Sequence, residues 1–320
     1  MNILEVKNLN LGFETEAGFR QALFDVSFSL EKGQIHALVG ESGCGKTISA
    51  MSILKLLPKN ARITSGEILF ENKNLLELNS KELQQIRGAK IALIPQDPMT
   101  SLNPLYTIGN QLLEVIAIHQ GLKGKEAEKK AIEALEMVQI PSVKERLNTY
   151  PHEFSGGMKQ RAIIAMALAC NAQIIIADEP TTALDVTIQA QIMDILDNIK
   201  KGLGTSILLI THDLALVKDC ADKISVMYAG RIVESAPTKE FFTHVSHPYS
   251  KALLKALPSN VVKKGEKLAI IEGQPPSIQQ NISGCKFHPR CPFAMPVCPK
   301  EIPELKEIKL KHFNACHLNK

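Results

Sequence analysis

The chain has 320 residues, with 37 basic and 33 acidic side chains and a formal net charge of +4. That length can bury a substantial core, so we expect no disulfide or metal to hold the main body together. The charges are well mixed apart from a basic stretch over residues 123–130, which argues against nucleic acid as a partner.

No stretch approaches the roughly 18 consecutive apolar residues of a membrane span. Residues 1–5 also lack the basic-then-apolar order of a signal peptide. We therefore expect a cytoplasmic chain whose role at any membrane comes through partner proteins.

Short apolar segments predict the strands. Residues 24–30 alternate apolar and polar side chains, so we expect an antiparallel sheet near the start of the chain. Later segments are apolar without alternation, as in parallel strands covered on both faces. These are Ile35–Val39, Ile91–Ile94, Ile174–Ala177 and Ile207–Ile210.

Two further regions lack strand patterns. Between about residues 101 and 169, Ile132, Leu135 and Val138 recur at helical spacing, which predicts a helical subdomain at about residues 100–170. After Tyr249, repeated prolines interrupt any regular period. We expect a main domain over residues 1–250 and a separate C-terminal extension over residues 251–320.

A glycine-rich segment follows one predicted strand and opens a predicted helix. It reads Gly40-Glu41-Ser42-Gly43-Cys44-Gly45-Lys46-Thr47. Such glycines let the backbone wrap around phosphate, with N–H groups and a helix N-terminus directed at one anion. In this pattern Lys46 is expected to reach the β- and γ-phosphates and Thr47 to bind Mg²⁺. The alternative is a glycine-rich turn with an incidental lysine. Between a reactive thiol and a passive small side chain for Cys44, we favour the passive one.

Two acids, Asp178 and Glu179, end another predicted strand. Buried parallel strands carry functional groups at their carboxyl ends, where the phosphate loop also lies. We expect Asp178 to hold Mg²⁺, directly or through water, and Glu179 to orient and deprotonate the attacking water. Without the phosphate loop, two solvated acids would be the simpler interpretation.

Ser155, Gly156 and Gly157 precede a further apolar helix segment. Their N–H groups and hydroxyl suit an anion by the same reasoning. Since one chain cannot easily bring two such loops onto one γ-phosphate, we expect this second loop to serve a neighbouring subunit. Alone, the pattern would indicate a plain helix start.

These motifs, in this order, resemble the ATP-binding subunits of ABC transporters over about residues 3–245. They are residues 40–47, Gln96, residues 155–158, Asp178-Glu179, Ala183-Leu184-Asp185 and His212. The resemblance implies a RecA-like P-loop NTPase fold of the α/β class, with an antiparallel β subdomain and a helical subdomain, which binds ATP and Mg²⁺.

The resemblance also implies individual roles. Gln96 would link Mg²⁺ and the attacking water to the membrane partner, Asp185 would bridge two subunits, and His212 would contact the γ-phosphate. Phe13 lies where the family has an aromatic ring that stacks on adenine, with Phe19 as the rival. Met158 stands where the family often has glutamine, a departure that we expect to matter little.

Three shorter segments are similar to the oligopeptide, dipeptide and nickel uptake branch: residues 96–104, 247–250 and 273–277. This narrower resemblance implies an importer at the cytoplasmic face of the cell membrane. Its partners would be two permease subunits, an extracytoplasmic substrate-binding protein and a second ATP-binding subunit. We favour a heterodimer over a homodimer, and the segment from Met99 to Leu105 is expected to meet a permease. The sequence does not name the transported solute.

The C-terminal region contains Cys285, Cys291, Cys298 and Cys316, separated by gaps of 5, 6 and 17 residues. Structural zinc sites favour closer pairs. The spacing alone leaves zinc, an iron–sulfur cluster and free thiols open. The resemblance implies a [4Fe–4S] cluster held by these four cysteines, with zinc as the alternative and with His288, His312 and His317 as bystanders.

Two other functions remain. One is a non-transport ATPase of the same superfamily that acts on DNA or ribosomes, although the long coiled arms typical of those proteins are missing from the sequence. The other is a catalytically minor partner subunit whose cluster-bearing region is an interaction module, against which Lys46, Asp178, Glu179 and His212 argue.

Overall fold

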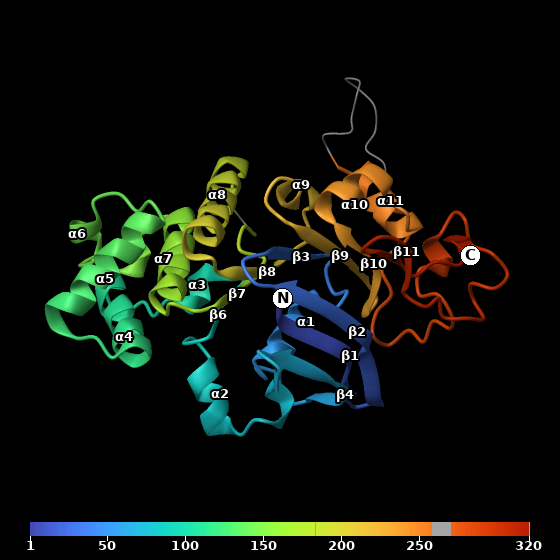
Figure 1. The fold of residues 1–320 in the computed structure, drawn as a ribbon, viewed down its shortest axis with the longest axis horizontal. Coiled ribbons are helices and arrows are strands. Elements are labelled where there is room, and N and C mark those ends of the chain that lie inside the picture. Colours follow the sequence, from blue (N-terminus) through green and yellow to red (C-terminus); the bar gives the residue numbers. More distant parts are fainter. Residues whose placement is uncertain (183, 258–269, 320) are drawn as a thin grey trace, which may run out of the picture. The chain divides into compact units, whose positions relative to one another are not determined.

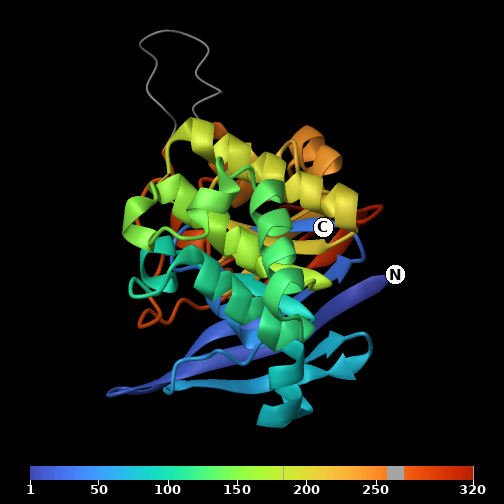
Figure 2. The ribbon, with the colours of Figure 1, turned by 90° about the vertical axis from the view of Figure 1, so that its left-hand side faces the viewer.

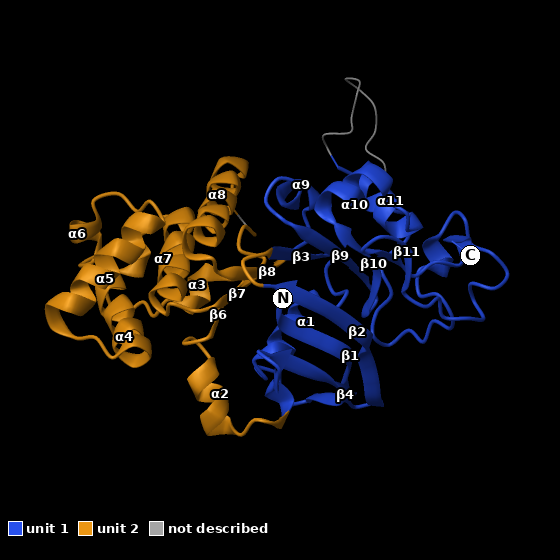
Figure 3. Cartoon of the chain, viewed as in Figure 1, with its two compact units in different colours: residues 1–31, 35–76, 211–320 blue, residues 32–34, 77–210 orange. Residues whose placement is uncertain are grey.

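A computed structural model describes residues 1–182, 184–257 and 270–319 (Figure 1). The chain divides into two compact units, which are coloured separately in Figure 3. Unit 1 comprises residues 1–31, 35–76 and 211–320, and unit 2 comprises residues 32–34 and 77–210.

An antiparallel sheet forms the first part of unit 1. Its order is β2-β1-β4-β5, from β1 (Asn2–Thr15), β2 (Gly18–Glu31), β4 (Ala61–Phe70) and β5 (Lys73–Asn74). Leu4 of β1 lies opposite Leu30 of β2 and Phe70 of β4, and all three side chains are buried. The antiparallel sheet predicted from the alternation of residues 24–30 is confirmed.

A second group of strands in unit 1 has the order β11-β12-β10-β9-β3. Its members are β3 (Ile35–Val39), β9 (Lys223–Tyr228), β10 (Arg231–Pro237), β11 (Lys306–Lys309) and β12 (His312–Asn314). Strands β3 and β9 run parallel and the other neighbours antiparallel. Every residue of β3 is buried, as its apolar sequence requires.

The helices of unit 1 are α1 (Lys46–Ile53), α9 (Leu214–Val217), α10 (Thr238–His244) and α11 (Pro248–Lys255). Short 3₁₀ turns lie at His288–Arg290 and His317–Asn319, and a third at Leu75–Glu77 begins in unit 1 and ends at the first residue of the next segment, which belongs to unit 2.

The C-terminal tail joins the sheet of unit 1. Strand β12 pairs with β10, Glu234 opposite Asn314, and the Ala315 N–H donates to Val233 O at 2.9 Å. The sequence did not predict these strands, because Lys306–Lys309 and His312–Asn314 are short and contain few apolar residues.

Unit 2 has a parallel sheet with the order β8-β7-β6. The strands are β6 (Ile91–Ile94), β7 (Ile174–Asp178) and β8 (Ser206–Thr211), whose last residue is counted with unit 1. Ile94 lies opposite Ala177, and Asp178 opposite Ile210. The predicted parallel strands are confirmed.

Helices make up the rest of unit 2, coloured from cyan (α2) through green to yellow (α8) in Figure 2. They are α2 (Ser80–Ile86), α3 (Pro98–Ser101), α4 (Ile108–Gln120), α5 (Gly124–Met137), α6 (Val143–Arg146), α7 (Gly156–Ala169) and α8 (Val186–Leu203), with a 3₁₀ turn at Pro151–Glu153. Helices α4, α5 and α7 contact one another, and Leu135 of α5 is buried. The expected helical subdomain is therefore present.

Candidate functional site

The phosphate loop connects β3 to α1, as the sequence predicted. Gly40 has a φ of 154°, and a Cβ added there would lie 2.3 Å from the Met227 carbonyl oxygen. Gly45 has a φ of 109° and precedes the first residue of α1. The Gly230 N–H donates to Cys44 O at 2.8 Å. Glycine is thus required at Gly40 and Gly45, because the loop packs against the backbone of the β9–β10 turn.

Lys46 lies over the loop that it belongs to. Its ammonium donates to Gly40 O at 2.8 Å and Glu41 O at 2.9 Å, and the residue is 4% exposed. The N–H groups at the start of α1 lie beside this cation, so an anion in the loop would meet both. Thr47 follows with an exposed side chain.

Cys44 is buried within the loop, and burial raises the pKa of its thiol. The nearby Lys46 ammonium, 3.8 Å from the sulfur, opposes that effect but is the smaller influence. The neutral thiol fits the passive role that we expected.

Glu41 forms hydrogen bonds with two residues, Tyr249 and Arg290, that were not expected at the site from the sequence. Its N–H donates to Tyr249 Oη at 2.9 Å, and its carboxylate accepts two hydrogen bonds from Arg290, at 2.8 and 3.0 Å. Tyr249 lies in the 247–250 segment and Arg290 lies between two of the C-terminal cysteines. Those positions were the available signals, but neither indicates a contact with the loop.

Unit 2 brings Gln96 and Glu179 together. Glu179 Oε2 accepts hydrogen bonds from Gln96 Nε2 at 3.1 Å and from Thr182 Oγ1 at 2.9 Å. The Glu179 backbone has a φ of 45°, and its N–H donates to Ile210 O at 2.9 Å. The left-handed backbone and the two side-chain donors fix the carboxylate at the carboxyl end of β7, next to the buried Asp178.

The Ser155 loop begins α7. Ser155 Oγ accepts the Met158 N–H at 3.3 Å, which makes Ser155 the N-cap, and both Ser155 and Gly156 are exposed. A Cβ at Gly157 would lie 2.8 Å from Ile188 Cγ2, so this glycine allows α7 and α8 to approach. The loop therefore faces solvent at a helix N-terminus.

Asp185 caps the next helix in the same unit. Its Oδ1 accepts the Ile188 N–H at 3.0 Å at the start of α8, and its side chain is exposed. Ala183, which belongs to the same predicted segment, lies outside the described residues.

The remaining predicted residues belong to unit 1. His212 follows β8 and is exposed. Phe13 lies in β1 opposite Arg20 and Ala61 and is half-buried. The Phe19 ring lies 5.1 Å from the Arg62 guanidinium, which covers one of its faces. The roles of Phe13 and His212 stay predictions.

The four C-terminal cysteines line one small cavity, together with Phe287 and His288. Each sulfur accepts a hydrogen bond from a backbone N–H group. The donors are Phe287 to Cys285, Phe293 to Cys291, Met295 to Cys298 and Leu318 to Cys316. Burial raises the pKa of Cys285 to about 11 and also raises the pKa values of Cys291 and Cys316.

Across residues 1–182, 184–257 and 270–319, no group of three or more His, Cys, Asp or Glu side chains has the arrangement of a metal site. The iron–sulfur centre expected from the resemblance is thus not shown.

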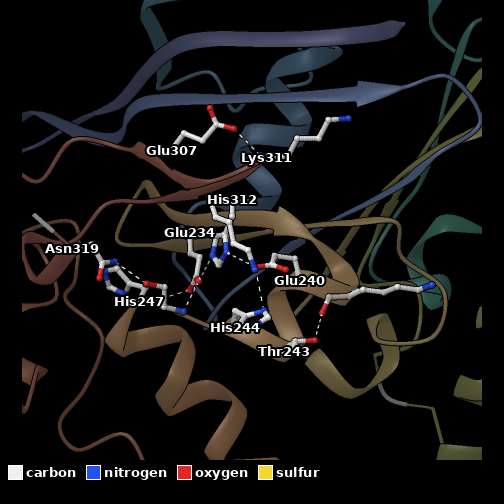
Figure 4. Close-up of polar contacts among 12 residues, drawn as sticks. Glu234, Glu240, Thr243, His244, His247, Glu307, Lys311, His312 and Asn319 are labelled. Atoms are coloured by element: carbon white, nitrogen blue, oxygen red, sulfur yellow. Dashed lines mark hydrogen bonds and ion pairs between the residues drawn. The ribbon is translucent and has the colours of Figure 1, made fainter.

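Three histidines near these cysteines have other partners. His288 Nδ1 lies 2.9 Å from Cys285 O, and His317 Nε2 lies 3.0 Å from Glu301 O. His312 Nε2 lies 2.8 Å from Glu234 Oε1, and both of these side chains are almost fully buried (Figure 4). Glu234 also accepts the His247 N–H at 3.0 Å. This cluster ties β12 to β10 and to the start of α11.

Comparison with known proteins identifies the family. The profile described as "ABC transporter" matches residues 23–182, and that of the "Oligopeptide/dipeptide transporter, C-terminal region" matches residues 233–298. The chain is 49% identical over 302 residues to the dipeptide transport ATP-binding protein DppD of Bacillus subtilis, an alignment that covers 94% of this chain and 90% of the relative. The chain belongs to the ATP-binding proteins of oligopeptide and dipeptide ABC transporters.

Further matches agree with this ABC transporter family. The oligopeptide transport ATP-binding protein OppD of Escherichia coli is 44% identical over 314 residues, covering 98% of this chain and 92% of its own. A solved dimeric ATP-binding cassette, in a post-hydrolysis state with ADP and Pi, has a TM-score of 0.66 and 29% identity, and covers 73% of this chain and 98% of its own. The resemblance inferred from the motifs is confirmed.

In the described part of this ABC transporter protein, none of the helices combines the length and the apolar character that crossing a membrane requires.

Proposed function

We propose that this chain hydrolyses ATP to energise the uptake of di- or oligopeptides by an ABC importer. The phosphate loop is the observation that carries the proposal. Glycine is sterically required at Gly40 and Gly45, and the Lys46 ammonium is held over the loop by two backbone carbonyls. The names of the relatives, a dipeptide and an oligopeptide transport ATP-binding protein, support peptides as the substrate class.

Each predicted residue then has a chemical role. Residues 40–47 surround the phosphates of ATP with N–H groups, and Lys46 neutralises the β- and γ-phosphates. Thr47, Asp178 and Gln96 supply oxygen ligands of the kind that Mg²⁺ prefers, and the ion would offset the charge that builds on the phosphates. His212 contacts the γ-phosphate and Phe13 stacks on adenine.

Glu179 acts as the general base. The hydrogen bonds from Gln96 and Thr182 hold its Oε2 in one place. From there the carboxylate accepts a proton from the water that attacks the γ-phosphorus. Because Gln96 touches this carboxylate and begins the segment that leads to Met99 and Leu105, a permease that moved the segment would alter the position of the base.

Two subunits share each nucleotide in this proposal. The exposed Ser155 and Gly156, together with Gly157, donate to the γ-phosphate of ATP held by the phosphate loop of a second ATP-binding subunit, and Asp185 bridges the two subunits. A dimeric relative of similar fold supports such a pair. We favour a heterodimer.

The other partners follow from the family. We propose two integral permease subunits and an extracytoplasmic substrate-binding protein, with this chain at the cytoplasmic face of the membrane. Met99 and Leu105 are 62% and 79% exposed, which suits a contact with a permease. We retain residues 1–250 as the ATP-binding domain, with a helical subdomain at about 100–170, and residues 251–320 as its extension.

The extension would hold a [4Fe–4S] cluster, with zinc as the alternative. Four thiols are available for such a centre, because Cys285, Cys291, Cys298 and Cys316 all line one cavity and each sulfur accepts a hydrogen bond from a backbone N–H group. Such hydrogen bonds stabilise thiolates and tune the potential of iron–sulfur centres. Iron, sulfide and zinc analysis of anaerobically purified protein decides between the two centres.

The proposed function is tested by Mg²⁺-dependent ATP binding. We expect Lys46→Ala to weaken ATP binding by about 100-fold, because the only cation of the loop is lost. Lys59→Ala, which removes an exposed lysine beyond α1, should leave the affinity within twofold. Calorimetric titration of the purified chain measures both. Equal affinity of Lys46→Ala and the wild type would contradict the proposal.

A further inference from the structure

The cysteine-rich tail holds the phosphate loop through one side chain. Arg290, next to Cys291, places its two terminal nitrogens 2.8 and 3.0 Å from the two carboxylate oxygens of Glu41. The Arg290 side chain is only 6% exposed and that of Glu41 is 24% exposed. This hydrogen bonding raises the pKa of Arg290, which stays charged. A bidentate, largely buried pair fixes orientation as well as charge.

Arg290 is itself held firmly by its surroundings. Its Nε donates to Glu272 O at 2.9 Å, Nη2 donates to Gly273 O at 3.2 Å, and Nη1 donates to Tyr228 Oη at 3.3 Å. The guanidinium therefore joins the residue 271–273 segment, the end of β9 and the phosphate loop. Its position depends on the 3₁₀ turn His288–Arg290 between Cys285 and Cys291.

The backbone N–H, the backbone carbonyl and the carboxylate of Glu41 all form hydrogen bonds that hold the phosphate loop. The N–H donates to Tyr249, the carbonyl accepts from Lys46, and the carboxylate accepts from Arg290. Glu41 is thus the point where the tail meets the phosphate loop. Without Arg290, a carboxylate would remain beside the site for a polyanion with no guanidinium to neutralise it.

We propose that Arg290 is a positioning residue for ATP, which neutralises Glu41 and keeps the phosphate loop in its ATP-binding shape. The inference rests on the proposed role of residues 40–47. Loss of Arg290 has two effects of the same sign: Glu41 repels the triphosphate, and the loop loses its brace. Both weaken ATP binding, and neither touches Glu179. Changes at the cysteines reach the loop through Arg290.

The first test separates binding from chemistry. Arg290→Ala is expected to raise both the Kd of Mg-ATP and KM about tenfold and to change kcat less than twofold. Arg290→Lys keeps the positive charge but cannot donate to both carboxylate oxygens of Glu41 at once. Its Kd for Mg-ATP should lie between those of the wild type and Arg290→Ala. The matched control is Lys286→Ala. Lys286 lies in the same tail segment, donates to Ile282 O at 2.6 Å and covers the Phe24 ring, so its loss should change Kd less than twofold.

A double-variant cycle tests whether Arg290 acts through Glu41. In a Glu41→Gln background, Arg290→Ala should raise Kd less than threefold, because no carboxylate remains to be neutralised. A full tenfold loss in that background would overturn the proposal. So would an unchanged Kd in Arg290→Ala. Circular dichroism and the midpoint of thermal unfolding verify that each variant is folded.

A cysteine variant tests the route from the tail. Cys291→Ser should weaken ATP binding in the wild type and have no further effect in Arg290→Ala, whereas equal effects in both would contradict transmission through Arg290. The inference and the proposed function fail differently. If the wild type shows no Mg-dependent ATP affinity, the proposed function is wrong. If the wild type binds ATP and Arg290→Ala binds it equally well, only the inference is wrong.

Discussion

The two glycine loops of this chain differ in how much of the protein supports them. The phosphate loop is backed by the β9–β10 turn, by Tyr249 and by Arg290, which come from distant parts of the sequence. The Ser155 loop is supported by its own helix cap and by the packing of Gly157 on Ile188. Ser155 and Gly156 are exposed.

This difference matches what a site divided between two subunits, as proposed above, would require. A loop that must hold a polyanion by itself needs neighbours that fix its shape and balance its charge. A loop that completes another subunit's site needs exposed donors at a helix N-terminus, and the Ser155 loop has these. The sequence motifs look alike, but their surroundings differ in the way that the two proposed roles require.

The largest expected effect comes from removing the proposed general base while both glycine loops stay intact. Glu179→Gln is expected to lower kcat by about 10²–10⁴-fold and to change ATP affinity by less than threefold. Steady-state phosphate release and calorimetry measure these two quantities. Glu133→Gln, in α5, is the control and should match the wild type, because the Glu133 carboxylate pairs with surface lysines such as Lys130. Unchanged turnover would reject Glu179 as the base.

Ser155→Ala tests whether the Ser155 loop acts on the neighbouring subunit's nucleotide and not on the chain's own. We expect turnover to fall about tenfold or more, since a donor to the neighbouring subunit's phosphate is lost. ATP affinity of the isolated chain should stay within twofold, because its own phosphate loop is untouched. Phosphate release by the assembled complex and calorimetry of the isolated chain provide the readouts.

Loss of a helix cap has its own cost of about 1 kcal/mol, which Thr107→Ala controls for. Thr107 caps α4 by accepting the Asn110 N–H at 3.2 Å. Urea unfolding should show similar destabilisation for the two variants, with turnover lost only in Ser155→Ala. Equal loss of turnover in both would show that Ser155 acts only as a cap.

The smallest effect concerns the strand beneath the phosphate loop. Burial lowers the pKa of His36, in β3, to about 3, well below its ordinary value of 6.5. Below pH 6.5, His36 therefore binds a proton in the unfolded chain but not in the folded chain. The free energy of unfolding consequently falls as the pH falls. From pH 6.5 to 5 the loss is at most about 2 kcal/mol. Urea midpoints at both pH values should shift less in His36→Gln, and an equal shift would contradict this assignment.

Local patterns predicted much of this molecule. Ile35–Val39 and Ile91–Ile94 were located from their apolar runs, because a strand covered on both faces leaves a continuous hydrophobic signal. The resemblance gave Gln96 and Glu179 roles at the same attacking water, but it did not predict the hydrogen bond between their side chains. The contact of Arg290 with Glu41 was not predicted either, because the two residues are 249 positions apart and no local period encodes such a pair.

The proposal that the Ser155 loop completes a partner's site is tested most directly by the oligomeric state of the Glu179→Gln variant, measured as its molecular mass in solution. Light scattering would be recorded for the chain alone, and for the chain with a second ATP-binding subunit, before and after addition of Mg-ATP. We predict that Mg-ATP produces a stable dimer of ATP-binding subunits. Introducing Ser155→Arg into the Glu179→Gln variant should abolish this dimer while ATP remains bound. Pairing that is unaffected by Ser155→Arg, or rapid hydrolysis by a wild-type chain that stays monomeric, would contradict the account.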